Sequence, residues 1–75
     1  MIKTFIEDIQ QLINQIETAV NNKEYENVVS LNENLVDLVD LGAQDLSNFK
    51  EFYEIVSWAK DQIDSFKQVI INQGA

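Results

Sequence analysis

The stretch FKEFYEIVSWAKDQIDSFKQVI, residues 49–70, decides the fold of this chain of 75 residues. Its apolar positions recur at alternating spacings of three and four residues, which places them on one side of an α-helix. They are Phe49, Phe52, Val56, Ala59, Ile63, Phe66 and Ile70. Because the stretch contains neither Pro nor Gly, it predicts one helix of more than twenty residues, about 35 Å long at ~1.5 Å per residue.

Two shorter helices are expected to cover this apolar side. The first spans residues 2–20, and the second spans residues 23–41. The first carries a stripe with the same alternation and a shoulder beside it: Ile2, Ile6, Ile9, Ile13, Ile16 and Val20, then Phe5, Leu12 and Ala19. The inward side of the second comprises Tyr25, Val28, Leu31, Leu35, Leu38 and Val39. Asn21 and Asn22 should end the first helix, since Asn tolerates the left-handed conformation, and Gly42 should end the second.

Residues 42–48 form the longest expected loop, in which Asp45 or Ser47 is available to cap the third helix. Short connections make consecutive helices antiparallel. The sequence therefore predicts an all-α fold, an up-down-up three-helix bundle with a long C-terminal helix, as a single domain over residues 1–75. The core is expected to join residues of all three helices, with Phe52, Val56, Ile63 and Phe66 packed against Ile9, Ile13, Leu31 and Leu35.

The charge of the chain narrows the class of partner. Thirteen Asp and Glu against five Lys, with no Arg and no His, give a formal charge of -8. Proteins bind nucleic acids by neutralising phosphates with Lys and Arg, so direct nucleic-acid binding is not expected, and anionic membrane surfaces are disfavoured for the same reason. No apolar run is long enough for a membrane span or typical of a signal peptide, and the absence of Cys fits a reducing compartment. We expect a cytoplasmic protein.

Catalytic mechanisms that depend on His or Cys are excluded, because the chain has neither. Pairs of carboxylates three residues apart do occur, at Asp37 and Asp40, at Glu51 and Glu54, and at Asp61 and Asp64. A di-metal site in a helical bundle would need Glu-x-x-His ligands on the inward side, whereas these pairs fall mostly opposite the apolar stripes. We therefore interpret them as a solvated surface and expect no enzyme, metal or cofactor.

The segment DLGAQDL, residues 40–46, resembles the attachment site of acyl carrier proteins, where a Ser between Asp and Leu carries phosphopantetheine. Asp45 stands where that Ser would be, and Ser47 lies two positions later. No prosthetic group is therefore expected.

Several apolar residues of the third helix fall outside its main stripe or near its end. They are Ile55, Trp58, Val69, Ile70 and Ile71. An off-stripe Trp is either packed under a neighbouring helix or presented to a partner, and Trp is enriched at binding hot spots. Because the third helix is longer than the other two, its end also has apolar surface that they do not cover. We predict that these five residues bind a partner.

A longer resemblance covers the first two helices and the turn between them. The run LINQIETAV, residues 12–20, followed by NNKEYENVVSL, residues 21–31, is similar to the start of the FliT-like flagellar export chaperones. Glu24 and Tyr25 match the acidic and aromatic pair that follows the turn in that family, and a long third helix follows in both. Residues 32–38 lack the basic residues common there. The resemblance implies a cytosolic protein that holds late flagellar subunits before export.

The expected function is that of a non-enzymatic interaction module, such as an export chaperone or small adaptor that binds an amphipathic partner helix in an apolar groove. The acidic charge of the chain suits a basic partner. Two alternatives stay open. One is an acidic inhibitor from a mobile element that imitates nucleic-acid phosphates, and the other is a bundle that only self-associates, for example as a homodimer. Binding through apolar residues should survive raised salt, whereas phosphate mimicry should weaken steeply.

Overall fold

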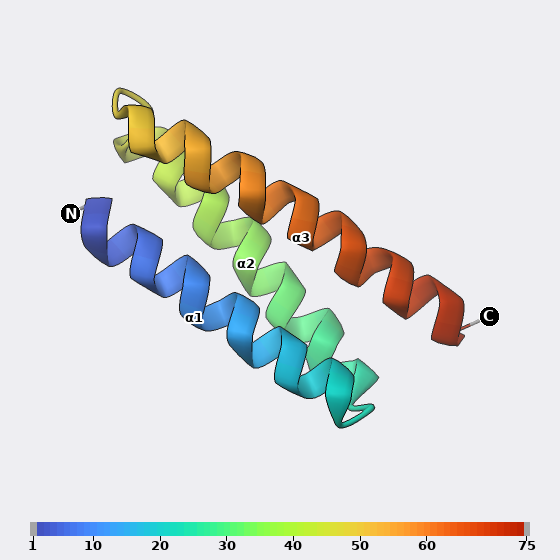
Figure 1. Ribbon diagram of the computed structural model, residues 1–75. Coiled ribbons are helices and arrows are strands. Elements are labelled where there is room, and N and C mark those ends of the chain that lie inside the picture. Colours follow the sequence, from blue (N-terminus) through green and yellow to red (C-terminus); the bar gives the residue numbers. More distant parts are fainter. Residues whose placement is uncertain (1, 75) are drawn as a thin grey trace.

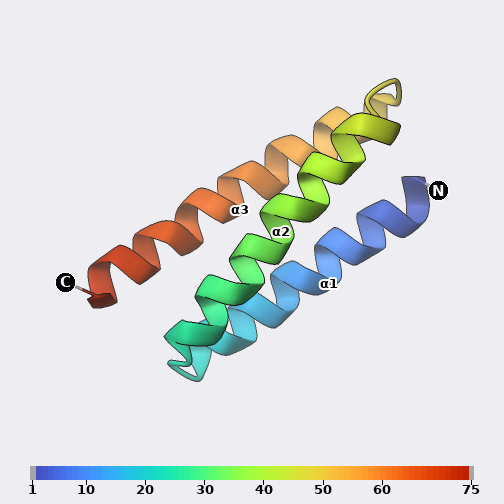
Figure 2. The ribbon, with the colours of Figure 1, turned by 180° about the vertical axis from the view of Figure 1, so that it is seen from behind.

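The computed structural model describes residues 2–74, and these residues form three helices packed against one another. Helix α1 spans Ile2–Asn21, α2 spans Tyr25–Asp45 and α3 spans Lys50–Gly74. Consecutive helices run antiparallel, so the first residues of α1 and the last residues of α3 lie at opposite ends of the bundle (Figure 1). The view from behind shows α2 running diagonally from the end of α1 to the start of α3 (Figure 2). The predicted all-α three-helix bundle is confirmed.

The core is a single cluster along the inner sides of all three helices. In α3 it contains Phe52, Val56, Ala59, Ile63 and Phe66, as the spacing predicts, with Ile70 partly buried at its edge. In α1 the most buried residues are Phe5, Ile9, Ile13, Ile16 and Ala19. Phe5 and Ala19 were expected on the shoulder, while Ile6 and Val20 of the expected stripe are only half-buried. The buried side of α1 is therefore rotated from the expected stripe toward Phe5 and Ala19.

Helix α2 contributes a core residue that the sequence pattern did not predict. Val28, Leu35 and Val39 are buried as expected, whereas Tyr25, Leu31 and Leu38 are only half-buried. Asn32 is 5% exposed and continues the buried series, four residues after Val28 and seven before Val39. Its Oδ1 atom is buried and has no hydrogen-bond partner within residues 2–74. A polar side chain therefore occupies an apolar layer of the bundle.

The predicted end of α2 at Gly42 is wrong, because the helix continues to Asp45. Gly42 is buried inside the helix, and a Cβ atom at this position would overlap the edge of the Phe5 ring of α1. A glycine in a helix commonly marks its end, but here it lets another helix approach closely. The connection to α3 is consequently shorter than expected, and it places Leu46 in the core.

Phe49 was predicted to belong to the apolar side of α3, but it precedes the helix and is 46% exposed. The chain turns through Leu46, whose backbone N–H donates to the Gly42 carbonyl at 2.7 Å, and the Phe49 N–H donates to the Leu46 carbonyl at 3.1 Å. The side-chain hydrogen bonds found within residues 2–74 do not include a cap from Asp45 or Ser47. Leu46 thus fills the core position that the pattern assigned to Phe49.

The turn between α1 and α2 depends on Lys23, although Asn21 and Asn22 were expected to supply the left-handed conformation. Lys23 has a φ of 60°, and its N–H donates to the Val20 carbonyl at 3.1 Å. The Glu24 N–H reaches back to the Ala19 carbonyl at 2.9 Å. These two bonds form a Schellman motif, in which glycine is the usual left-handed residue. Helix α2 therefore starts at Tyr25, two residues later than predicted.

Candidate protein interaction site

Ile55 and Trp58, two of the predicted partner-binding residues, line a groove between α1 and α3. We call it the α1/α3 groove, and it has a volume of about 340 Å³. Its lining consists of Ile6, Gln10, Glu51, Glu54, Ile55 and Trp58. Trp58 is 39% exposed, while Ile6 and Ile55 of the same lining are half-buried. The Trp58 side chain is thus partly packed against the bundle and partly exposed to solvent. It is neither fully packed under a neighbouring helix nor fully presented to a partner.

The other three predicted residues do not form one surface with this groove. Val69 lies on the same side of α3 as Trp58, but 11 residues farther along, which is about 16 Å at ~1.5 Å per residue. Ile70 continues the core stripe and is half-buried. Ile71 is 58% exposed, but it lies about 140° around the helix from Trp58, since each residue advances ~100°. The structure therefore joins Ile55 with Trp58, and separates Ile70 and Ile71 from them.

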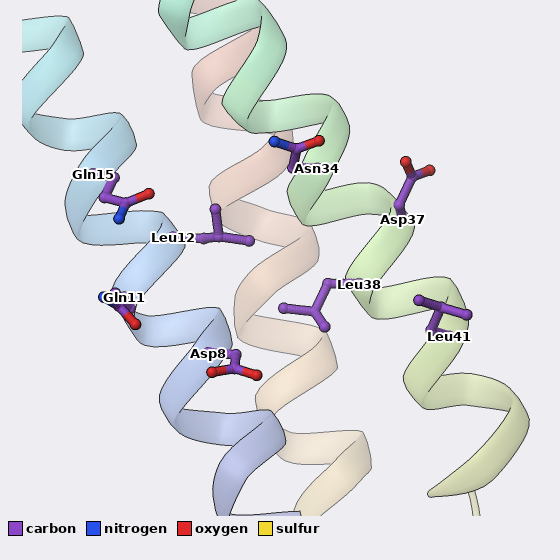
Figure 3. Close-up of a pocket in the computed structure, with 8 residues that line it drawn as sticks. All are labelled: Asp8, Gln11, Leu12, Gln15, Asn34, Asp37, Leu38 and Leu41. Carbon is purple, nitrogen blue, oxygen red and sulfur yellow. The ribbon is translucent and has the colours of Figure 1, made fainter.

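A second groove, between α1 and α2, was missed from the sequence. Two adjoining cavities of about 420 and 360 Å³ share Asp8, Leu38 and Leu41, and together form what we call the α1/α2 groove. One cavity is completed by Gln11, Leu12, Gln15, Asn34 and Asp37, and the other by Thr4, Phe5, Gly42, Asp45 and Leu46. Figure 3 shows Leu12 and Leu38 projecting toward each other from the two helices, with Asp8 on α1 near them and with Asp37 and Leu41 at the edge of α2 that is turned away from α1. Because the lining residues come from two helices, the apolar spacing within either helix alone did not predict this groove.

Leu41 is the most exposed apolar side chain of the α1/α2 groove, at 58%. It lies about 140° around α2 from the core residue Val28, which is 13 residues earlier, at ~100° per residue. Leu38 sits between Leu41 and the core and is half-buried. Scattered exposed leucines are common on proteins, but this one continues an apolar floor that starts in the core. The signal in the sequence was the pair Leu38 and Leu41, which extends the apolar side of α2 from the core toward its outer surface.

Carboxylates are spread over the outside of the bundle. All six members of the pairs at residues 37 and 40, 51 and 54, and 61 and 64 are exposed. Within residues 2–74, no three side chains of the ligand types Asp, Glu, His and Cys come close enough together to hold a metal ion. Of the three pairs, one member of the first lines the α1/α2 groove and both members of the second line the α1/α3 groove. Some of the acidic residues therefore border the apolar grooves, while others, such as Asp61 and Asp64, do not.

None of the helices within residues 2–74 has a stretch both long and apolar enough to cross a membrane. Comparison of the chain with protein-family models, with curated proteins and with solved structures finds no match in any of the three.

Proposed function

We propose that this chain is a non-enzymatic protein-interaction module that binds an amphipathic helix of a partner protein in the α1/α3 groove. The observation that carries the proposal is the position of Trp58, which is 39% exposed on a floor formed by Ile6 and Ile55. A Trp ring that is held by its own fold and still open on one side matches the large, rigid anchors found at interface hot spots.

The shape of the groove favours a helical partner. It runs between two nearly parallel helices, and an amphipathic helix laid along it can place its apolar side onto Ile6, Ile55 and Trp58. Glu51, Glu54 and Gln10 border the apolar floor and offer acceptors for polar side chains of the partner. Val69 would extend the contact if the partner helix continued along α3.

The type of module that we propose is a cytoplasmic export chaperone or a small adaptor. The support is the similarity of residues 12–31 to the FliT-like flagellar export chaperones, together with the order of the elements: a helix, a short polar turn, a second helix and a long third helix. Tyr25 of the matching acidic and aromatic pair is half-buried at the first position of α2. A client segment of a secreted subunit would then occupy the α1/α3 groove.

Affinity capture from the native host tests this proposal, with the parent chain and Trp58→Ser as baits. Leu41→Ser is the matched control, because Leu41 is also exposed and apolar but lines the other groove. We expect one partner to be retained by the parent and by Leu41→Ser, and lost with Trp58→Ser. A synthetic peptide of the retained segment should shift the emission of Trp58, the only Trp in the chain, and Trp58→Ser should weaken its binding about thirtyfold.

Retention of the same partner by Trp58→Ser would overturn the proposal, and so would the absence of any specific partner. Salt separates the remaining alternatives. Binding that persists at high ionic strength supports apolar anchoring at Trp58, whereas steep loss with salt supports phosphate mimicry by the carboxylates. Sedimentation of the parent over a range of concentrations would detect self-association directly.

A further inference from the structure

From the α1/α2 groove we infer a second docking surface, which binds a basic amphipathic helix from a partner protein. The inference goes beyond the proposed function, which concerns the α1/α3 groove. Its apolar anchors are Leu12, Leu38 and Leu41, and its charged rim is Asp8, Asp37 and Asp45.

The groove has the length of a helical recognition site. Along α1 its lining extends from Thr4 to Gln15, which is about 17 Å at ~1.5 Å per residue. Along α2 and the residue that follows it, the lining extends from Asn34 to Leu46, a similar distance. Three turns of a docked helix span this length and present an apolar residue to the floor on each turn. The two cavities share residues, so the floor is continuous over this distance.

The charge of the rim selects the partner. Asp8 on α1 and Asp37 and Asp45 on α2 are all exposed and line the two cavities, so both helices that flank the groove contribute carboxylates. No Lys lines either cavity in the part of the chain that the structure describes, and no salt bridge is therefore available to neutralise these groups within the groove. A partner helix with a leucine stripe and lysines or arginines on its flanks matches this arrangement.

A second copy of the chain is a poor occupant of the same groove. Each copy has a formal charge of -8, and a homodimer formed here would bring two acidic rims together. Like charges placed across an interface oppose association, so self-association through this face is disfavoured. The apolar floor also distinguishes the groove from the carboxylates at Asp61 and Asp64, which are exposed on α3 and line none of the grooves described above.

Titration with a labelled synthetic helix tests the inference. The probe has leucines on one side and lysines on both flanks, and a second peptide carries glutamate in place of lysine. We expect the lysine peptide alone to bind the parent, without changing the emission of Trp58. Leu41→Ser should weaken binding about tenfold, the loss expected for removing a buried Leu contact, and Trp58→Ser should not change it.

Matched charge variants distinguish binding in the α1/α2 groove from nonspecific attraction of the peptide to an acidic chain. The double variant Asp37→Asn, Asp45→Asn removes two charges from the rim, while Asp61→Asn, Asp64→Asn removes two elsewhere. The double variant at residues 37 and 45 should weaken binding of the lysine peptide about threefold to tenfold and reduce the dependence of binding on salt. The double variant at residues 61 and 64 should leave the affinity and its salt dependence nearly unchanged. Circular dichroism should show unchanged helix content in all variants, because every substituted side chain is exposed.

Equal weakening by the two double variants would show nonspecific attraction and overturn the inference, as would the absence of binding by the lysine peptide. Binding that Trp58→Ser abolishes and Leu41→Ser spares would overturn it as well, while assigning the peptide to the α1/α3 groove and supporting the proposed function. Two results together would support this inference and reject the proposed function. The Trp58→Ser variant would bind the partner captured from the host as tightly as the parent does, and the Leu41→Ser variant would lose binding of the lysine peptide.

Discussion

The α1/α3 groove and the α1/α2 groove lie on either side of α1, and they are built differently. The first depends on one large ring, Trp58, with glutamates on the same helix, whereas the second is assembled from leucines on two helices with aspartates on both. A large aromatic residue off the main stripe is visible in the sequence of one helix. A floor shared by two helices becomes visible only when their rotation and register are known. The most conspicuous apolar residue therefore need not mark the larger of the two grooves.

The largest expected effect concerns Phe52, which supports the α1/α2 groove from below. Its ring lies against that of Phe5 at 5.8 Å between centroids, and Phe5 lines the groove. Phe52→Ala should lower the free energy of unfolding by ~3 to 5 kcal/mol, because it leaves a cavity in the core. Phe66→Ala should cost a similar amount, but Phe66 lines neither groove. Urea denaturation measures both losses.

The two Phe variants also sharpen the comparison of the grooves. In the folded fraction, Phe52→Ala should weaken binding of the lysine peptide, because the Phe5 ring loses its contact with the Phe52 ring. Phe66→Ala should not weaken this binding. A variant that unfolds at the same urea concentration as the parent would contradict the helix rotation described here.

Asn32 tests whether a polar core residue is needed to shape the grooves. Its Oδ1 atom is buried without a hydrogen-bond partner among residues 2–74, and such an acceptor costs ~1 to 3 kcal/mol. Asn32→Leu should therefore raise the free energy of unfolding by about 2 kcal/mol and leave peptide binding at both grooves unchanged. Urea denaturation and peptide titration measure the two quantities. A loss of stability would show that Oδ1 is satisfied in solution, and altered binding would show that Asn32 fixes the register of the helices.

Gly42 and Phe5 both line the α1/α2 groove, and a substitution at Gly42 tests the contact between them. Gly42→Ala places a methyl group against the Phe5 ring, and overpacking costs ~1 to 3 kcal/mol, against a gain in helix propensity of ~1 kcal/mol. We expect a net loss of about 1 kcal/mol in the parent. In the Phe5→Leu background the same change should be neutral or stabilising, because the ring edge is gone. A double-mutant cycle by urea denaturation measures this coupling, and additive effects would contradict the close contact.

An effect as small as that of Gly42→Ala, but of opposite sign, is expected at the turn that joins α1 to α2. Lys23→Gly should raise the free energy of unfolding by ~1 kcal/mol, because Lys is strained at a φ of 60° and Gly is not. Lys60→Gly is the matched control in the exposed interior of α3, and it should lower stability by ~1 kcal/mol. Thermal denaturation of both variants checks the opposite signs. Losses in both would show that Lys23 makes a favourable contact that outweighs the strain.

The sequence by itself determined the number of helices, their order and most of the core of α3. Apolar spacing reports which side of a helix is buried, so Phe52, Val56, Ile63 and Phe66 were found correctly. The same information identified Ile55 and Trp58 as residues outside the main stripe. These features depend on positions within one helix, which sequence spacing describes directly.

Tertiary structure decided how far α2 extends, which residue joins it to α3 and where the second groove lies. From the sequence, Gly42 indicates the end of a helix, but in the structure it lies inside α2 against the Phe5 ring of α1. Leu46 is buried in the core, whereas Phe49, which was expected there, is exposed. Leu12 and Leu41 belong to one groove only because α1 and α2 pack with a particular rotation and register. That packing depends on the sizes of side chains from different helices, which spacing within any one helix does not contain.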